Sequence, residues 1–134
     1  MMVLIDTPIW SQGFRRTRRP RPPESVELTE LIRDGRAAII GPIRQELLSG
    51  VKSHRQFELL RDQLRAFPDV ELMVEDFELA AQFFNRCRAH GIQGSNTDFL
   101  ICAVAIRWDY SIFTTDKEFA AFARLIPIAR HALR

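Results

Sequence analysis

The sequence predicts an α/β fold in which helices cover both faces of a mainly parallel sheet. Three short apolar runs, at residues 2–5, 37–40 and 111–114, have the composition of strands that are buried on both faces. Segments with helical periodicity separate these runs. Parallel strands joined through helices need right-handed crossovers, which place helices on both sides of the sheet. With 134 residues, of which 46% are hydrophobic, the chain is expected to form one domain over residues 1–134.

Helices and edge strands complete the expected order of elements. Helices are expected at about residues 7–14, 24–33, 42–49, 53–67, 76–90, 97–108 and 119–123. Pro42 favours a helix start and Gly91 a helix end. The helix at 76–90 is expected to bury Phe77. Residues 70–74 are expected to form an edge strand or an extended segment, and residues 126–128, which contain a proline, an edge strand.

The positive charge of the chain is concentrated in arginine. Of the 19 basic residues 17 are Arg, although the formal net charge is only +2. Five of them share one stretch with three prolines and no acid: Arg15, Arg16, Arg18, Arg19 and Arg21. Proline excludes a regular helix interior there, so we expect a basic loop. This loop is either a phosphate-binding arm or a solvated surface excursion.

Several residues argue against a disulfide-bonded, zinc-binding, secreted or membrane-spanning protein. Cys87 and Cys102 lie within apolar helical patterns and are expected to be buried and unpaired, which fits a reducing cytosol. With the histidines they show no zinc-ligand spacing, and each histidine is expected at the surface or at a helix end. The apolar run at residues 1–5 is too short for a signal peptide or a membrane span. We therefore expect a cytoplasmic protein without membrane contact.

Four acids fall where an α/β sheet gathers functional groups. Asp6 and Asp116 follow the carboxyl ends of buried strands, and Glu46 and Asp98 lie in the first turns of expected helices. Each acid alone has a plain structural interpretation. Asp6 would cap a helix, Glu46 would lie at the surface, and Asp98 would favour the positive end of a helix dipole behind a cap at residue 96 or 97. Together, all four could point into one cleft.

Four carboxylates in one cleft would repel one another unless a cation neutralised them. Ligands that offer only oxygen suit Mg²⁺ or Mn²⁺. An ion held by carboxylates can activate a water molecule and neutralise charge on a phosphodiester. This chemistry requires acids that are spread over the chain and gathered by the fold, which is the arrangement that the sequence predicts.

Four motifs, in this order, resemble those of PIN domains, in particular those of the VapC toxins of bacterial and archaeal toxin–antitoxin pairs. The motifs are Val3-Leu4-Ile5-Asp6-Thr7, Gln45-Glu46-Leu47-Leu48-Ser49-Gly50, Thr97-Asp98-Phe99-Leu100-Ile101 and Phe113-Thr114-Thr115-Asp116-Lys117-Glu118-Phe119. The resemblance covers essentially the whole chain. It implies a three-layer α/β/α sandwich with a central, mainly parallel sheet of about five strands.

The resemblance also implies a Mg²⁺- or Mn²⁺-dependent endoribonuclease whose acidic positions match the four acids above. On this basis Asp6 and Asp98 are expected to make the main metal contacts. Glu46 and Asp116 are expected to bind a second ion or to orient the attacking water. Three threonines are expected to support the acids through hydrogen bonds: Thr114, Thr115 and, as a weaker candidate, Thr7.

The partners that the resemblance implies are an RNA substrate, a second copy of the chain and a small antitoxin. In this family the antitoxin wraps a hydrophobic groove and blocks the active site. Two alternatives remain open. One is a module on the same fold that binds nucleic acid or a partner without catalysis, although such a module has no need for four repelling carboxylates. The other is a DNase or a housekeeping RNA-processing nuclease.

Overall fold

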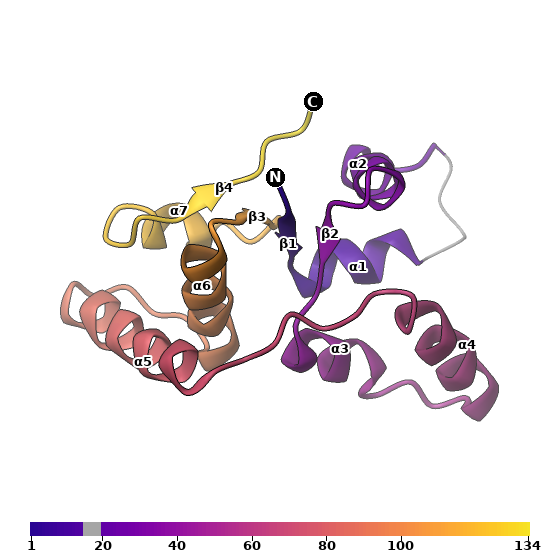
Figure 1. Ribbon diagram of the computed structural model, residues 1–134, viewed down its shortest axis with the longest axis horizontal. Coiled ribbons are helices and arrows are strands. Elements are labelled where there is room, and N and C mark those ends of the chain that lie inside the picture. Colours follow the sequence, from indigo (N-terminus) through magenta and orange to yellow (C-terminus); the bar gives the residue numbers. More distant parts are fainter. Residues whose placement is uncertain (15–19) are drawn as a thin grey trace.

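Short strands alternate with helices over the residues that the structure, a computed structural model, describes, namely 1–14 and 20–134 (Figure 1). The elements are β1 (Val3–Ile5), α1 (Thr7–Gly13), α2 (Pro23–Arg33), β2 (Ala37–Ala38), α3 (Gly41–Leu48), α4 (His54–Leu64), α5 (Val74–Ala89), α6 (Asn96–Trp108), β3 (Ser111–Phe113), α7 (Glu118–Phe122) and β4 (Ala129–Arg130). The predicted positions Arg15, Arg16, Arg18 and Arg19 lie outside the described residues. None of the helices in the described ranges is long and apolar enough to cross a membrane.

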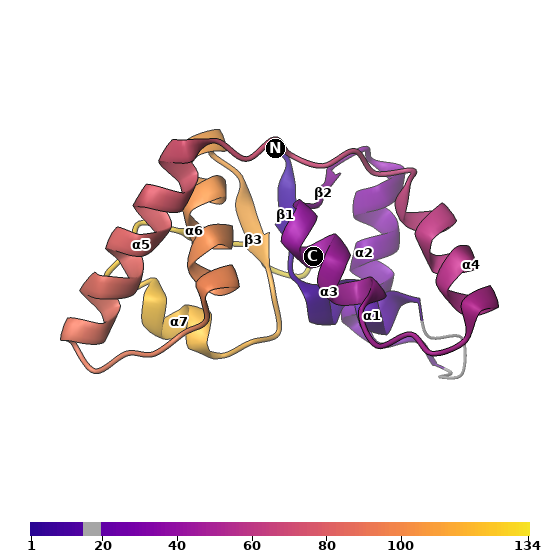
Figure 2. The same ribbon diagram turned by 90° about the horizontal axis from the view of Figure 1, so that it is seen from below.

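The sheet is parallel, with the strand order β2-β1-β3-β4. Leu4 of β1 pairs with Ala38 on one side and with Ile112 on the other. The connection from β1 to β2 therefore moves toward one edge of the sheet, and the connection from β2 to β3 moves back toward the other edge. Right-handed crossovers in opposite directions place helices on both faces. Figures 1 and 2 show the strands between α1–α4 and α5–α7, which confirms the predicted α/β sheet with flanking helices.

The strand count differs from the prediction, because the described chain forms four strands rather than about five. Residues 70–73 form no strand: the isolated bridge just before them pairs Asp69 with Ile39, the Val70 N–H donates to Ile39 O at 2.9 Å, and Val74 already begins α5. At residues 126–128, the Ile126 N–H still bonds to Phe122 O at 2.8 Å, so the chain is completing the turn after α7. The last strand, β4, forms three residues later than expected.

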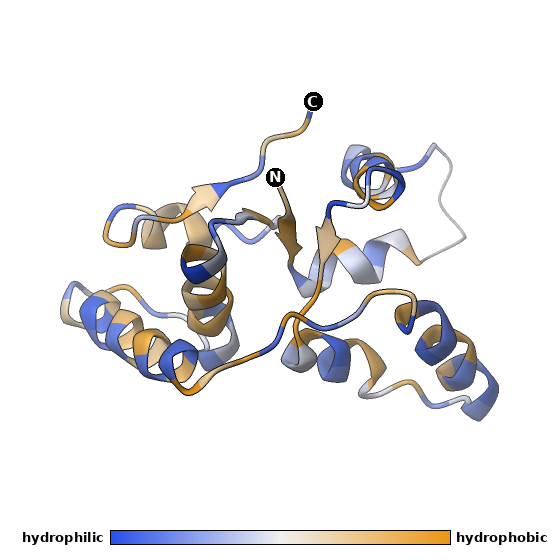
Figure 3. Cartoon of the chain, in the orientation of Figure 1, coloured by the Kyte–Doolittle hydropathy of each residue, from blue (hydrophilic) through white to orange (hydrophobic). Residues whose placement is uncertain are grey.

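Helix α6 is the most deeply buried helix of the fold. All seven residues from Phe99 to Ala105 are buried, in contact with α5 and β3. Figure 3 shows β1, β2 and most of α6 in hydrophobic colours, whereas α4 and α5 alternate between hydrophobic and hydrophilic residues. Both cysteines lie in this core and are free, as predicted. The buried run makes α6 a rigid mount for the residues at its amino end.

An ion pair between Asp76 and Arg107 fixes the start of α5 against the end of α6. The guanidinium donates to both carboxylate oxygens, at 2.6 and 2.8 Å, and Asp76 also accepts the Met73 N–H. Asp76 is 1% exposed, so this contact turns the next residue outward. The prediction that Phe77 is buried is wrong for this reason, since Phe77 is 54% exposed and Phe83 is buried instead.

The residues after β4 return to α2 and close over a second buried acid. Glu27 on α2 is buried and contacts His131 Nε2 at 2.7 Å and Arg134 Nε at 2.8 Å. The expectation that each histidine lies at the surface or at a helix end holds for His54 and His90 but is wrong for His131, which is partly buried outside any helix. Its ring lies against Phe113 of β3, which no local pattern predicts.

We expect Arg107→Ala to lower the free energy of unfolding by roughly 2–4 kcal/mol near neutral pH, because hydrogen bonds to charged groups contribute about 1.5–3 kcal/mol each. Burial alone would raise the pKa of Asp76, but the hydrogen bonds from Arg107 and Met73 hold it below its usual range. The loss should therefore shrink as the pH falls below about 4. Urea denaturation of both proteins measures it.

Arg55→Ala is the matched control for this measurement, because Arg55 is exposed on α4. Its effect should stay within about 0.5 kcal/mol. Equal losses in the two variants would show that the contact between Arg107 and Asp76 contributes nothing specific.

Candidate active site

The candidate site lies where β1 and β3 end side by side. The chain leaves these two neighbouring strands toward opposite sides of the sheet, which opens a crevice at their carboxyl ends. Asp6 follows β1 directly, and its N–H donates to Phe113 O of β3 at 2.9 Å. The Trp10 indole N–H donates back to Ile5 O at 3.0 Å and fixes the turn from β1 into α1.

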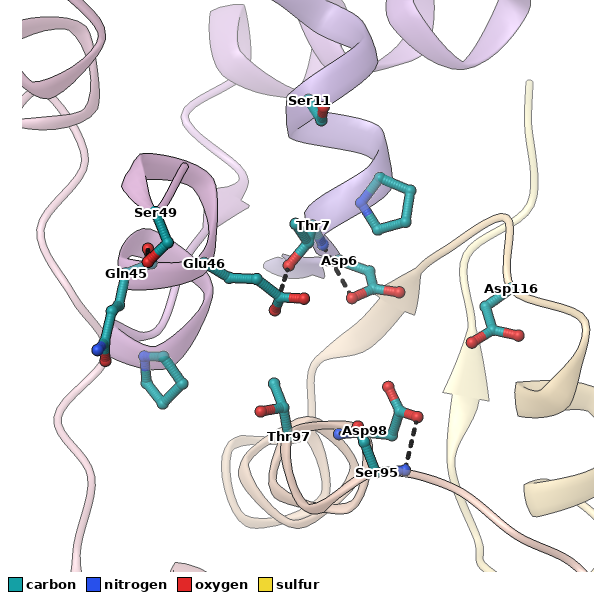
Figure 4. A pocket seen from close by; sticks show the side chains of 12 residues that line it. Asp6, Thr7, Ser11, Gln45, Glu46, Ser49, Ser95, Thr97, Asp98 and Asp116 are labelled. Atoms are coloured by element: carbon teal, nitrogen blue, oxygen red, sulfur yellow. Dashed lines mark hydrogen bonds between the residues drawn. The ribbon is translucent and has the colours of Figure 1, made fainter. Parts of the chain in front are cut away.

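A pocket of about 600 Å³ occupies this crevice, and all four predicted acids line it (Figure 4). Its lining is Asp6, Thr7, Pro8, Ser11, Pro42, Gln45, Glu46, Ser49, Ser95, Thr97, Asp98 and Asp116. The acids come from the end of β1, from α3, from the first turn of α6 and from the segment after β3. The structure thus brings together residues that the sequence spreads over more than 100 positions. We call this the acidic pocket.

Asp6 is the most buried of the four acids, at 6% exposure. Its Oδ1 accepts the Thr7 N–H at 2.8 Å, which caps α1, and its Oδ2 accepts the Thr114 hydroxyl at 2.8 Å. Burial raises the pKa of Asp6, the charges of Asp98 and Asp116 raise it further, and the two hydrogen bonds offset only part of the shift. Asp6 is therefore both a helix cap and an acid that is costly to keep charged without a counter-ion.

Asp98 occupies the first turn of α6 in a capping box. Ser95 is the cap, rather than residue 96 or 97 as expected: its Oγ accepts the Asp98 N–H at 3.1 Å, and Asp98 Oδ2 accepts the Ser95 N–H at 3.0 Å. The spacing Ser-x-x-Asp is the sequence signature of this motif and would have located the cap. Burial raises the pKa of Asp98, and the charges of Asp116 and Glu46 add to this shift.

Glu46 reaches the acidic pocket from the second turn of α3, not from the first turn as expected. The helix already begins at Gly41, because Pro42 is suited to its first turn. Glu46 Oε2 accepts the Thr7 hydroxyl at 3.1 Å, so the predicted support by Thr7 is present in this form (Figure 4).

Asp116 is held by the turn that follows β3. The Thr114 hydroxyl accepts the Asp116 N–H at 3.0 Å while it donates to Asp6, so one threonine links two acids. Asp116 Oδ1 in turn accepts the Glu118 N–H at 2.9 Å. One carboxylate oxygen each of Asp98, Asp116 and Glu118 lies within 4.8 Å of the others. Glu118, which was not among the predicted candidates, is exposed and does not line the acidic pocket, but a turn across two residues that is typical of aspartate brings it beside two of the acids.

Among the predicted site residues that the structure describes, Thr114 supports two acids without lining the acidic pocket, and Thr115 and Arg21 lie away from it. Thr115 is exposed and lines a neighbouring hollow with Glu24 of α2, because the turn that directs Thr114 inward directs the next residue away. The Arg21 guanidinium donates to Ser25 O at 3.0 Å and to Thr29 Oγ1 at 2.7 Å, which ties it to α2.

The donor set of the acidic pocket fits a hard divalent cation. Among its described lining residues, the charged ones are all carboxylates and the others are proline or neutral polar residues. Oxygen donors of this kind are the ligands that Mg²⁺ and Mn²⁺ prefer. A cation would also favour the charged forms of Asp6 and Asp98, which burial disfavours.

We expect Asp98→Asn to raise the melting temperature of the metal-free protein near neutral pH. Asparagine keeps an oxygen that can accept the Ser95 N–H but carries no charge. Because the pKa of Asp98 is raised in the folded state, folded protein binds this proton more readily than unfolded chain, and wild-type stability falls as the pH rises above about 4. The advantage of the variant should therefore be smaller at about pH 4 than near neutral pH, as thermal unfolding with a chelator would show.

The exposed control Asp62→Asn should show no such gain in melting temperature. An Asp98→Asn protein that melts below wild type near neutral pH would contradict the expectation.

Comparisons with known proteins agree with the fold and the motifs. The family model of the PIN domain matches residues 3–125. Ribonuclease VapC11 of Mycobacterium tuberculosis and VapC ribonuclease Mb1587 of Mycobacterium bovis are each 31% identical to the chain, over 99% of it and 100% of their own length.

Two solved structures share the fold at low sequence identity. The crystal structure of FitAcB from Neisseria gonorrhoeae matches with a TM-score of 0.77 and 20% identity, over 98% of this chain and 97% of that one. VapBC2 from Rickettsia felis, bound to a DNA fragment from their promoter, matches with a TM-score of 0.76 and 19% identity, over 98% of each chain. With the family match and the 31% identical relatives, these likenesses lead to one conclusion: the chain belongs to the PIN-domain family and, within it, to the VapC ribonucleases.

Proposed function

We propose that the protein is a metal-dependent endoribonuclease of one domain that hydrolyses RNA phosphodiesters and leaves 5′-phosphate and 3′-hydroxyl ends. The observation that carries this proposal is the acidic pocket, in which four separate parts of the fold present carboxylates and no described lining residue offers a positive charge. A module that only binds nucleic acid would gain nothing from this repulsion. The relatives that cover the whole chain are named as ribonucleases, which supports the same reaction class.

In this proposal the four acids have two roles: two of them make the main contacts to the metal ion, and the other two bind a second ion or orient the attacking water. Asp6 and Asp98 make the main contacts to Mg²⁺ or Mn²⁺, and Glu46 and Asp116 bind a second ion or orient the attacking water. Glu118 adds a further oxygen donor beside Asp98 and Asp116. When bound, the metal supplies an activated water and neutralises charge on the phosphodiester.

The threonines of the site act through the acids. Thr114 orients Asp6 and the turn before Asp116, because its hydroxyl donates to one and accepts from the other. Thr7 orients Glu46 in the same way. Their hydrogen bonds hold the carboxylates in place before a metal ion arrives, which is the usual role of groups that contact metal ligands.

We further propose that the protein acts in the cytoplasm as the toxin of a toxin–antitoxin pair and forms a homodimer. One related structure is described as a toxin–antitoxin complex from Klebsiella pneumoniae. An apolar hollow of about 620 Å³ between α1, α3 and α4, with Phe14, Leu47 and the exposed Leu59 among its lining residues, is our candidate for the antitoxin groove. Ser11 lines both this hollow and the acidic pocket, so a segment bound in one could reach the other.

Purified protein should cleave single-stranded RNA when Mg²⁺ or Mn²⁺ is present and should stop when a chelator removes the metal. Asp98→Asn should lower the cleavage rate by at least about 100-fold, because transition-state stabilisation by a metal is worth several kcal/mol. Gel analysis of labelled RNA measures the rate. The matched control Asp62→Asn removes an exposed acid of α4 and should keep the wild-type rate. Cleavage that persists with a chelator and in Asp98→Asn would disprove the mechanism.

Expression in a bacterial host should separate a toxin from a housekeeping nuclease. We expect wild-type protein to arrest growth when expressed alone and to be harmless when the adjacent open reading frame is expressed with it. Asp98→Asn should be harmless in both cases, because cleavage causes the arrest. Growth curves and colony counts report the outcome. RNA cleavage in vitro without growth arrest would support the ribonuclease activity, contradict the role as a toxin and favour an RNA-processing role.

A further inference from the structure

A further hollow lies at the loop that joins α5 to α6, a loop that can be followed in Figure 2. Its volume is about 240 Å³, and it is lined by Phe84, Arg88, Ile92, Gln93, Gly94 and Phe99. We call it the loop hollow. Pockets that enclose whole small molecules have volumes of about 300–1,000 Å³. The loop hollow is smaller, so its size fits one ring system rather than a complete nucleotide.

The loop hollow and the acidic pocket share one stretch of backbone. Gly94 lines the hollow, and its neighbour in the chain, Ser95, lines the acidic pocket and caps the helix that carries Asp98. Consecutive Cα atoms are about 3.8 Å apart. The two sites thus adjoin at this point of the backbone, where a polymer bound at the acids can extend into the hollow.

The wall of the loop hollow offers an aromatic ring and a cation. The Phe84 ring is partly exposed and is held edge-on against the buried Phe99, with centroids 5.6 Å apart and an angle of 75°. Arg88, one turn further along α5, is exposed and forms no ion pair with the residues that the structure describes. Aromatic rings stack on unpaired bases, and arginine pairs with phosphate groups.

The rim of the loop hollow consists of the backbone at Gln93 and Gly94, and packing fixes its conformation. Gln93 and Gly94 line the hollow, and their N–H and C=O groups form no backbone hydrogen bond within the described ranges. A Cβ on Gly94 would lie 2.5 Å from Phe122 Cζ and 3.0 Å from a Phe99 ring atom. The backbone at Gly94 is thus pressed against two rings, and only glycine fits there without displacing them.

We propose that the loop hollow binds one unpaired nucleobase of the RNA, next to the phosphodiester that the acidic pocket cleaves, and thereby selects the cleavage sequence. This inference rests on the proposed ribonuclease function. The base stacks on Phe84, its edge pairs with the backbone of Gln93 and Gly94, and Arg88 pairs with an adjoining phosphate. Single-stranded RNA is read in this way because its bases are free to leave the stack.

The test is cleavage of single-stranded RNAs with randomised positions, followed by sequencing of the product ends. Wild type should prefer one base at a single position beside the cut. Phe84→Leu keeps an apolar side chain against Phe99 but loses the planar face. It should therefore reduce that preference by about fivefold or more, since stacking of a base is worth about 1–3 kcal/mol. Arg88→Ala should slow cleavage of all sequences alike, because a phosphate contact reads no base.

The control Arg55→Ala removes an exposed arginine of α4 and should change neither rate nor preference. Wild-type cleavage without base preference, or an unchanged preference in Phe84→Leu, would overturn the proposal. If wild type does not cleave RNA, the ribonuclease proposal fails. Whether the loop hollow is a base site is then tested separately, by measuring RNA binding. Fluorescence anisotropy with labelled single-stranded RNA would then support a base site if Phe84→Leu weakened binding about fivefold, and would overturn it if binding were unchanged.

Discussion

The contact between the carboxyl ends of β1 and β3 is the constraint on which the rest of the structure depends. The Asp6 N–H donates to Phe113 O, and the Thr114 hydroxyl donates to the Asp6 carboxylate, so backbone and side chain are fixed at one point. The connections leave these strands toward opposite sides, so the space in front of them stays open. Helices α3 and α6 can then bring Glu46 and Asp98 to this space from distant parts of the chain.

Two of the acids serve the fold and the pocket at the same time. Asp6 caps α1, and Asp98 belongs to the capping box of α6. A helix cap contributes about 1 kcal/mol and also fixes the orientation of its side chain. The plain structural interpretation and the functional one are therefore compatible. Burial disfavours the charged form of both carboxyls, so binding of a cation would relieve a cost that the folded chain already carries.

Local patterns predicted the elements that position the site, and contacts between distant elements account for the differences. The apolar runs at β1 and β3 and the buried length of α6 follow from composition and period. Phe77 is exposed because a pair with Arg107, at the far end of another helix, draws Asp76 inward. The acid at position 118 comes near Asp98 only through the turn after β3, which no helix or strand period encodes. Thr115 was expected beside its neighbour Thr114, yet a turn directs adjacent side chains to different sides.

The hydrogen bond between Thr114 and Asp6 has a consequence for the synthesis of the protein. It joins residues 108 positions apart, and β1 gains its partner β3 only after residues 111–113 have been synthesised. A nascent chain without residues 111–116 lacks Asp116 and the threonine that orients the first acid. Domains fold as units while the ribosome delivers about 5–20 residues each second. The acidic pocket is thus assembled only after this stretch has been synthesised, because Asp6 is made 108 residues before the threonine that orients it.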